Sequence, residues 1–260
     1  MNERTVLRRA GLLGVIPLIV VGVALIMGRF PYPDDNVDGH EYLAYMLPRR
    51  LGEVQAILWS VLALSAVMFV AVLALAYRQN ETHVQREKGV ALSRVAMVAG
   101  AVMFAVLQFV LAALYEGATL FARGYPGFGS DPSDTRLITF VWGVINSTYT
   151  LSCLAMALVF LAIASANRAS PLLPRALGGW AAITVAVVNV AAVGSVFVTT
   201  GKWSPGSICA LGLQAAPTFL WMATAGAVLQ RRAQTLPKAP RAVATDPQAS
   251  EGKESPKLAG

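Results

Sequence analysis

The sequence predicts an all-α integral membrane protein, a bundle of six transmembrane helices with both termini in the cytoplasm. Hydrophobic residues make up 56% of the 260 positions and charged residues only 13%, whereas soluble domains carry about 25% charged residues. Long apolar stretches recur along the chain, and the lysines and arginines gather in alternate connecting segments. Together these three observations indicate that most of the surface faces lipid.

Each apolar stretch is long enough to cross about 30 Å of hydrocarbon as a helix. The predicted spans are residues 11–29, 54–77, 92–115, 138–164, 178–199 and 207–229. The first follows the basic segment RTVLRRAG and so has the flank of a signal peptide. Its apolar core is longer than the usual 7–15 residues, and ALIMGRF is a poor cleavage site, so we expect an uncleaved span.

The basic residues set the expected orientation. With the N-terminus inside, fifteen of the 21 lysines and arginines fall on the cytoplasmic side and six outside, which satisfies the positive-inside rule. The net charge of +7 is therefore explained by membrane orientation. No basic surface interleaved with aromatic residues is seen, so we expect no nucleic-acid partner.

The connecting segments have distinct compositions. The first outer loop is acidic, and its EYLAYMLPRRL portion is expected to form an interfacial helix with Tyr42 and Tyr45 at headgroup depth. The second outer loop, RGYPGFGSDPSDTR, is rich in turn residues. Inside, Pro171 and Pro174 should keep the link before Gly178 out of helix. Residues 1–232 thus form the transmembrane domain, and residues 233–260 are expected to be a disordered cytoplasmic tail.

Four carboxamide side chains lie between the midplane and the outer surface of four different spans: Gln108, Asn146, Asn189 and Gln214. Lipid offers no hydrogen bonds, so these amides should turn toward one another or toward water. Tyr149 lies on the Asn146 face and Thr218 on the Gln214 face. Glu116, near the outer boundary, is the strongest candidate for a functional acid. The candidate ligand-binding residues are therefore Gln108, Glu116, Asn146, Tyr149, Asn189, Gln214 and Thr218.

Three functional readings remain open. In the first, the amides line an outward-facing pocket that binds or transports a small molecule or ion. In the second, they form interhelical hydrogen bonds in a non-catalytic accessory subunit that packs against a partner membrane protein or a second copy. The third reading is an intramembrane enzyme that uses Glu116 and the acids of residues 34–41. An open, wet pocket favours the first reading and a dry, closed network favours the second.

Motifs for catalysis and metal binding are missing. The sequence has no phosphate-binding loop, no H-E-x-x-H motif and no histidine within a span. We therefore expect no cofactor, no metal and no catalytic residue, which favours a non-enzyme. Cys153 and Cys209 should lie at different depths of the membrane and remain free thiols.

Small residues recur at helical spacing in the last two spans. Gly178, Ala182 and Ala186 form one stripe, and Gly212 and Ala216 form another. Because such stripes let helices approach closely, we expect the fifth and sixth spans to pack tightly together.

The stretch SPLLPRALGGWAAITVAVVNVAAVGSVF, followed by a last span ending in Gln-Arg-Arg, resembles the C-terminal part of uncharacterised multi-span integral membrane proteins of actinobacterial type. The shared pattern is LPR-x-LG-x-W, here Leu173, Pro174, Arg175, Leu177, Gly178 and Trp180. The resemblance implies a bacterial plasma membrane and supplies no catalytic residue.

Overall fold

The computed structural model describes residues 2–27, 39–47, 51–81, 90–125, 127–128, 130–198, 201, 203–204 and 208–236. This part of the chain is all-α, as expected, and contains seven α-helices and no strand. The α-helices are α1 (Glu3–Met27), α2 (Gly39–Met46), α3 (Leu51–Asn80), α5 (Val90–Gly124), α6 (Pro132–Ala169), α7 (Ala182–Val193) and α8 (Ile208–Thr235). A π-helical turn, η2 (Ala176–Ala181), leads into α7, and a 3-10 turn, η3 (Gly194–Phe197), follows it.

Five helical segments are long and apolar enough to cross a membrane. They are Glu3–Ala24, Leu51–Asn80, Val90–Gly124, Pro132–Ala169 and Ala176–Phe197, and they match the first five predicted spans in order. Helix α8 has 28 residues, or about 42 Å, but it is not among these five segments. The count of six spans and their orientation therefore remain predictions.

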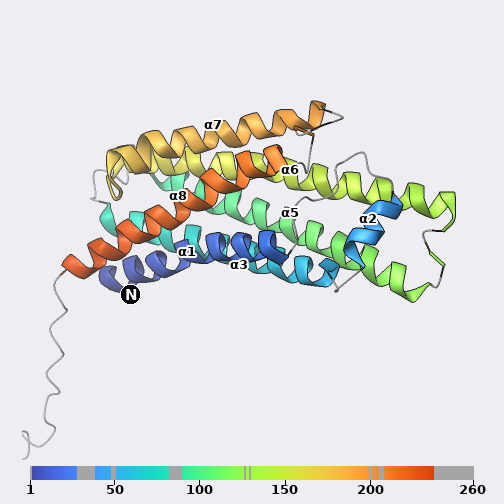
Figure 1. The fold of residues 1–260 in the computed structure, drawn as a ribbon. Coiled ribbons are helices and arrows are strands. Elements are labelled where there is room, and N and C mark those ends of the chain that lie inside the picture. The colour runs from blue at the N-terminus through green and yellow to red at the C-terminus, as the bar shows by residue number, and fades with distance from the viewer. Residues whose placement is uncertain are drawn as a thin grey trace, which may run out of the picture.

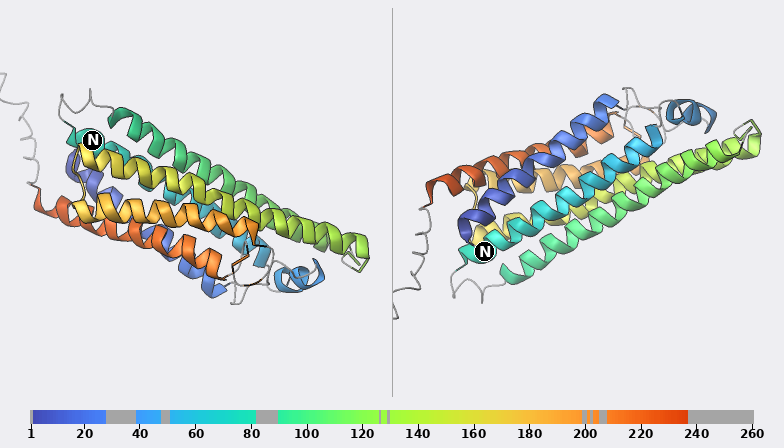
Figure 2. Two further views of the ribbon diagram at one scale, coloured as in Figure 1. Left: turned by 90° about the horizontal axis from the view of Figure 1, so that it is seen from above. Right: turned by 90° about the horizontal axis from the view of Figure 1, so that it is seen from below.

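The long helices run side by side, and the first turn of α1 lies at the same end of the bundle as the last turn of α8 (Figure 1). We call this the N-terminal end. The opposite end holds α2 and the connection between α5 and α6, and we call it the hairpin end (Figure 2). The described part of α8 continues to Thr235, three residues past the predicted domain limit, and residues 237–260 of the predicted tail lie outside the described residues.

Helix α8 packs most extensively against α1, and its contact with α7 is much smaller. A Cβ added at Gly14 would lie 2.6 Å from the Met222 carbonyl oxygen, and one added at Gly226 would lie 2.8 Å from that of Gly11. The expected tight packing of the last two spans is therefore wrong. Gly212 and Ala216 are exposed, and the glycines that allow close approach lie between the first and last helices.

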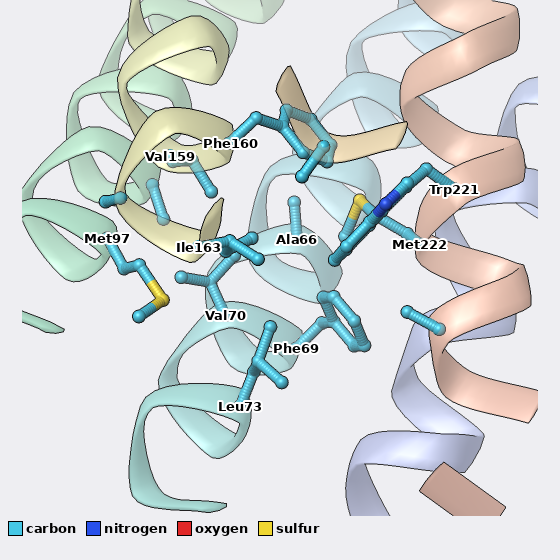
Figure 3. Close-up of a cluster of buried hydrophobic side chains, with 14 of the residues drawn as sticks. Ala66, Phe69, Val70, Leu73, Met97, Val159, Phe160, Ile163, Trp221 and Met222 are labelled. Carbon is cyan, nitrogen blue, oxygen red and sulfur yellow. The ribbon is translucent and has the colours of Figure 1, made fainter. Parts of the chain in front are cut away.

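The main core lies between α3, α6 and α8 toward the N-terminal end (Figure 3). Phe69 of α3 is fully buried, and the ring of Phe160 from α6 meets that of Trp221 edge-on, with centroids 4.9 Å apart. Val6, Leu7 and Ala10 of α1 are fully buried in the same cluster. The first helix is thus part of the packed bundle.

A second apolar cluster lies at the hairpin end, where α2 packs against α6. Tyr42 is only 1% exposed, with its ring centroid 4.5 Å from that of Trp142, and burial raises the pKa of its hydroxyl well above the usual range. The expected headgroup anchor is therefore a core residue, because α2 folds back onto the bundle. Tyr45 is only partly buried.

Candidate functional site in the polar core

Ser152 of α6 joins two of the four predicted amides. The Nε2 atom of Gln108, from α5, donates to Ser152 Oγ at 3.0 Å. The Nε2 atom of Gln214, from α8, lies 3.4 Å from the same oxygen and 3.3 Å from the carbonyl oxygen of Tyr149. Ser152 Oγ itself donates to that carbonyl at 2.6 Å. Three helices are therefore linked around one hydroxyl.

The third amide joins α7 to α8. Asn189 Nδ2 donates to Thr218 Oγ1 at 2.9 Å and to the carbonyl oxygen of Val185, one turn earlier, at 2.9 Å. Asn189 is fully buried and Thr218 is 2% exposed. This predicted pair is thus an interhelical contact shielded from lipid.

Asn146 is 5% exposed and lies on α6, six residues before Ser152, or about 9 Å along the helix. Its backbone carbonyl accepts a hydrogen bond from Thr150 Oγ1 at 2.9 Å. All four amides are therefore turned into the bundle, as the cost of burying them in lipid requires.

Little space remains among these groups. Tyr149, Asn189, Gln214 and Thr218 border a cavity of about 10 Å³ whose other walls include Leu62, Phe104, Met156 and Phe219. A single water needs roughly 10–15 Å³, so the cavity holds about one water at most. Two buried amide oxygens, Gln108 Oε1 and Asn189 Oδ1, have no hydrogen-bond partner within the described chain.

Glu116 lies apart from this network. It is exposed, and it borders a groove of about 400 Å³ between α3 and α5, together with Glu53, Ser60 and Phe109. Eight residues on an α-helix advance about 80° beyond two full turns, so Glu116 does not share the face of Gln108. Glu53 forms an ion pair with Arg123 across the same two helices.

Ser152 was missed as a site residue. It follows Asn146 by six residues, which takes it off the i, i+3, i+4, i+7 face on which Asn146, Tyr149 and Cys153 were placed. Its role could have been found from the second face of the same helix, because α6 is buried around much of its circumference. A helix surrounded by neighbours needs polar partners on more than one side.

The described residues contain no group of three or more histidines, cysteines or acids that could hold a metal ion. Cys153 is buried and Cys209 partly buried, and both are free thiols, which confirms that prediction. No acid borders the small cavity of the polar core, and Glu53 and Glu116 border the separate groove between α3 and α5.

Comparison with known proteins finds no protein-family model, no curated protein and no solved structure that matches this chain. Its function has to be inferred from the geometry of its own residues.

Proposed function

We propose that this chain is a six-span membrane protein with both termini in the cytoplasm, which acts as a non-catalytic accessory subunit packed against a partner membrane protein. The observation that carries the proposal is the closed polar core, where only about 10 Å³ is left among the amides. Sites for small molecules usually measure about 300–1,000 Å³. An amide network without such a space has the character of interhelical bonding.

The sixth span is supported by packing. Helix α8 makes its largest contact with α1, which is one of the five apolar segments. A helix lying along a spanning helix occupies the same depth of the bilayer. Arg231 and Arg232 lie near the last turn of α8, and Arg8 and Arg9 near the first turns of α1. All four then fall at the N-terminal end, which the positive-inside rule places in the cytoplasm.

The hairpin end offers the partner a surface. Helices α5 and α6 have 35 and 38 residues, or about 52 and 57 Å, against about 30 Å of hydrocarbon. Beyond the third predicted span, the rings of Phe121, Tyr125 and Phe128 cluster, and Phe121 and Tyr125 are exposed. Phe140, at the outer end of the fourth predicted span, is 68% exposed. Exposed aromatic residues of this kind are enriched at protein interfaces.

Labelling of intact cells tests the topology. In a Cys209→Ser background, a cysteine introduced by Ser130→Cys, in the α5–α6 connection, should react with a membrane-impermeant maleimide. One introduced by Gln234→Cys, at the end of α8, should react only after permeabilisation. Three predicted spans lie between the two sites, so the sites should be on opposite sides of the membrane. Labelling of both sites from outside would therefore contradict the proposed topology.

Purification in mild detergent tests the accessory role. The full-length protein should carry one stoichiometric membrane partner, and the Phe121→Ser/Phe140→Ser variant should lose it. The control is Val102→Ser/Leu154→Ser, which alters exposed apolar residues in the middle of the same two helices. Loss of the partner from both variants, or a protein that purifies alone, would refute the role assigned to the hairpin end.

An orphan amide oxygen on the small cavity favours a second candidate function, the binding of a single monovalent cation in the polar core. Asn189 borders that cavity, and its Oδ1 is an acceptor without a donor among the described residues, as suits a small cation. Sodium or potassium chloride should then raise the melting temperature above that in N-methylglucamine chloride at equal ionic strength. Asn189→Leu should abolish the difference. Equal melting temperatures in all three salts exclude the cation.

A further inference from the structure

A larger cavity lies on the surface of the bundle at its N-terminal end, where the end of α6 meets η2 and the start of α7. It measures about 520 Å³ and is bordered by two arginines, Arg168 and Arg175, and by the ring of Trp180. Its remaining walls are mostly apolar and include Ala164, Gly179 and Ile183. It is separate from the polar core and uses none of the predicted site residues.

The floor of this cavity is built by Asn167 of α6. Its Oδ1 atom accepts hydrogen bonds from the backbone nitrogens of Leu172 and Leu173 at 3.1 and 2.8 Å and from the Tyr77 hydroxyl at 3.1 Å, and its Nδ2 donates to the Leu173 carbonyl at 3.1 Å. The two-proline link is non-helical at residues 170–174, as predicted, but helix resumes at Arg175, earlier than the expected Gly178. These hydrogen bonds fix the link against α3 and α6. A fixed link holds Arg175 in a defined place.

Helix α8 fixes the same link from another side. Arg232 donates to the Leu172 carbonyl at 2.8 Å and to Asn80 Oδ1 at 3.1 Å. Trp221 Nε1 donates to the Leu177 carbonyl at 2.9 Å. Gly178 packs so closely that a Cβ there would lie 2.4 Å from Asn167 Nδ2. Four of the six residues of the LPR-x-LG-x-W pattern are thus accounted for by packing and backbone geometry.

The other two residues of that pattern, Arg175 and Trp180, are exposed and face the cavity. Trp180 is 69% exposed. Neither Arg175 nor Arg168 makes an ion pair or a hydrogen bond with the part of the chain that the structure describes, and no acid borders the cavity. The site therefore presents two uncompensated positive charges above apolar walls.

We infer that this cavity binds an anionic glycerophospholipid, with the headgroup phosphate between Arg168 and Arg175 and an acyl chain along Gly179 and Ile183. Arginine guanidinium groups match phosphate oxygens in geometry and charge. Tryptophan favours the headgroup depth, and basic pockets between spanning helices on the cytoplasmic side suit anionic headgroups. The π-helical turn at residues 176–181 is a kind of distortion frequent at functional sites.

Lipid titration of the purified, delipidated full-length protein tests this inference. Native mass spectrometry should show phosphatidylglycerol bound at least tenfold more tightly than phosphatidylcholine. Each basic residue near an anionic membrane surface adds about fivefold to binding, so Arg168→Gln/Arg175→Gln should weaken phosphatidylglycerol binding about 30-fold. Inorganic phosphate at equal concentration should not displace the lipid.

Two further variants separate the cavity from general charge and from misfolding. Arg8→Gln/Arg231→Gln removes two exposed arginines at the same end of the bundle, outside the cavity, and should leave binding unchanged. Gly179→Leu places a side chain in the cavity where a Cβ would meet only Arg175 Cγ, at 4.0 Å. It keeps both charges and has a higher helix propensity than glycine, so it should block the lipid without lowering the melting temperature of the lipid-free protein.

The possible results are decisive. Selective loss in Arg168→Gln/Arg175→Gln and in Gly179→Leu supports the lipid site. Equal loss in Arg8→Gln/Arg231→Gln means that the attraction is a general surface charge and overturns it. Equal binding of phosphatidylcholine, or displacement of the lipid by inorganic phosphate, also overturns it, because the site would then not recognise an anionic lipid.

Discussion

At the residue scale, the physical rule that found the polar core was the lack of hydrogen-bond partners in lipid. This rule predicted that the four amide side chains face the interior of the bundle, and each is at most 5% exposed. They are Gln108, Asn146, Asn189 and Gln214. The rule could not say which groups would bond, because that depends on the rotation of each helix against its neighbours. Ser152, which accepts from two of the amides, had the same sequence signature as any small polar residue in a span.

Ser152→Ala should destabilise the protein by about 1–2 kcal/mol, because it leaves the donors of Gln108 and Gln214 buried without their shared acceptor. Melting in detergent measures the change. Replacing Gln108 with methionine in the Ser152→Ala protein should recover part of the loss, since one orphan donor is removed. If the two substitutions are simply additive, Ser152 does not link the helices.

At the element scale, apolar length predicted the five helices that are long and apolar enough to cross a membrane, but not how these helices pack. Small-residue stripes at steps of four occur in several spans, and only close approach in three dimensions shows which are used. The stripe on α8 at Gly212 and Ala216 is exposed, whereas Gly226 on the same helix meets Gly11 and Gly14. Sequence spacing shows which small residues could allow two helices to approach closely. The point at which α8 crosses α1 determines that Gly226 is the one that does so.

Gly14→Ala should lower the stability by about 1–3 kcal/mol, as overpacking does, because the new Cβ would lie 2.6 Å from the backbone oxygen of Met222. Gly22→Ala is the matched control on the same helix, where nothing lies within 4 Å. That change should be neutral or stabilise by up to about 1 kcal/mol, through helix propensity. Similar melting temperatures for the two variants would contradict the α1–α8 crossing.

Asp131 caps the N-terminus of α6. Its carboxylate accepts hydrogen bonds from the side chain and backbone nitrogen of Ser133, and these bonds lower its pKa. A pKa lower in the folded state means that ionised Asp131 stabilises the fold above the usual aspartate pKa. That stabilisation disappears as the pH falls through the lowered value.

The pH dependence separates capping from charge. Asp131→Ala should melt below the wild type at neutral pH, and the gap should close as the carboxyl group is protonated. Asp131→Asn retains a capping oxygen without titrating, so its advantage over the alanine variant should be independent of pH. If the difference in melting temperature between the wild type and Asp131→Ala did not change with pH, the carboxylate would not be the cap.

At the scale of the whole molecule, composition and charge were enough to identify a membrane bundle, because they depend on the solvent and not on the details of packing. The distribution of lysine and arginine predicts orientation in the same way. The interior could not be predicted to this level. The volume left between the packed side chains decides whether the four amides border a pocket or form a dry network. Here the cavity among them measures about 10 Å³.

The first helix provides the test of the whole arrangement. Residues 11–29 read alone have some features of a signal peptide, yet α1 packs between α3 and α8, and its Val6, Leu7 and Ala10 are fully buried. Deleting residues 2–27 would uncover Phe69 and Leu229, two fully buried core residues. The truncated protein should therefore fail to give a monodisperse peak in detergent chromatography, whereas deleting residues 241–260 should leave the peak unchanged. A stable, monodisperse protein without α1 would show that the bundle closes without its first helix, and the depth assigned to α8 from its contact with α1 would have to be abandoned.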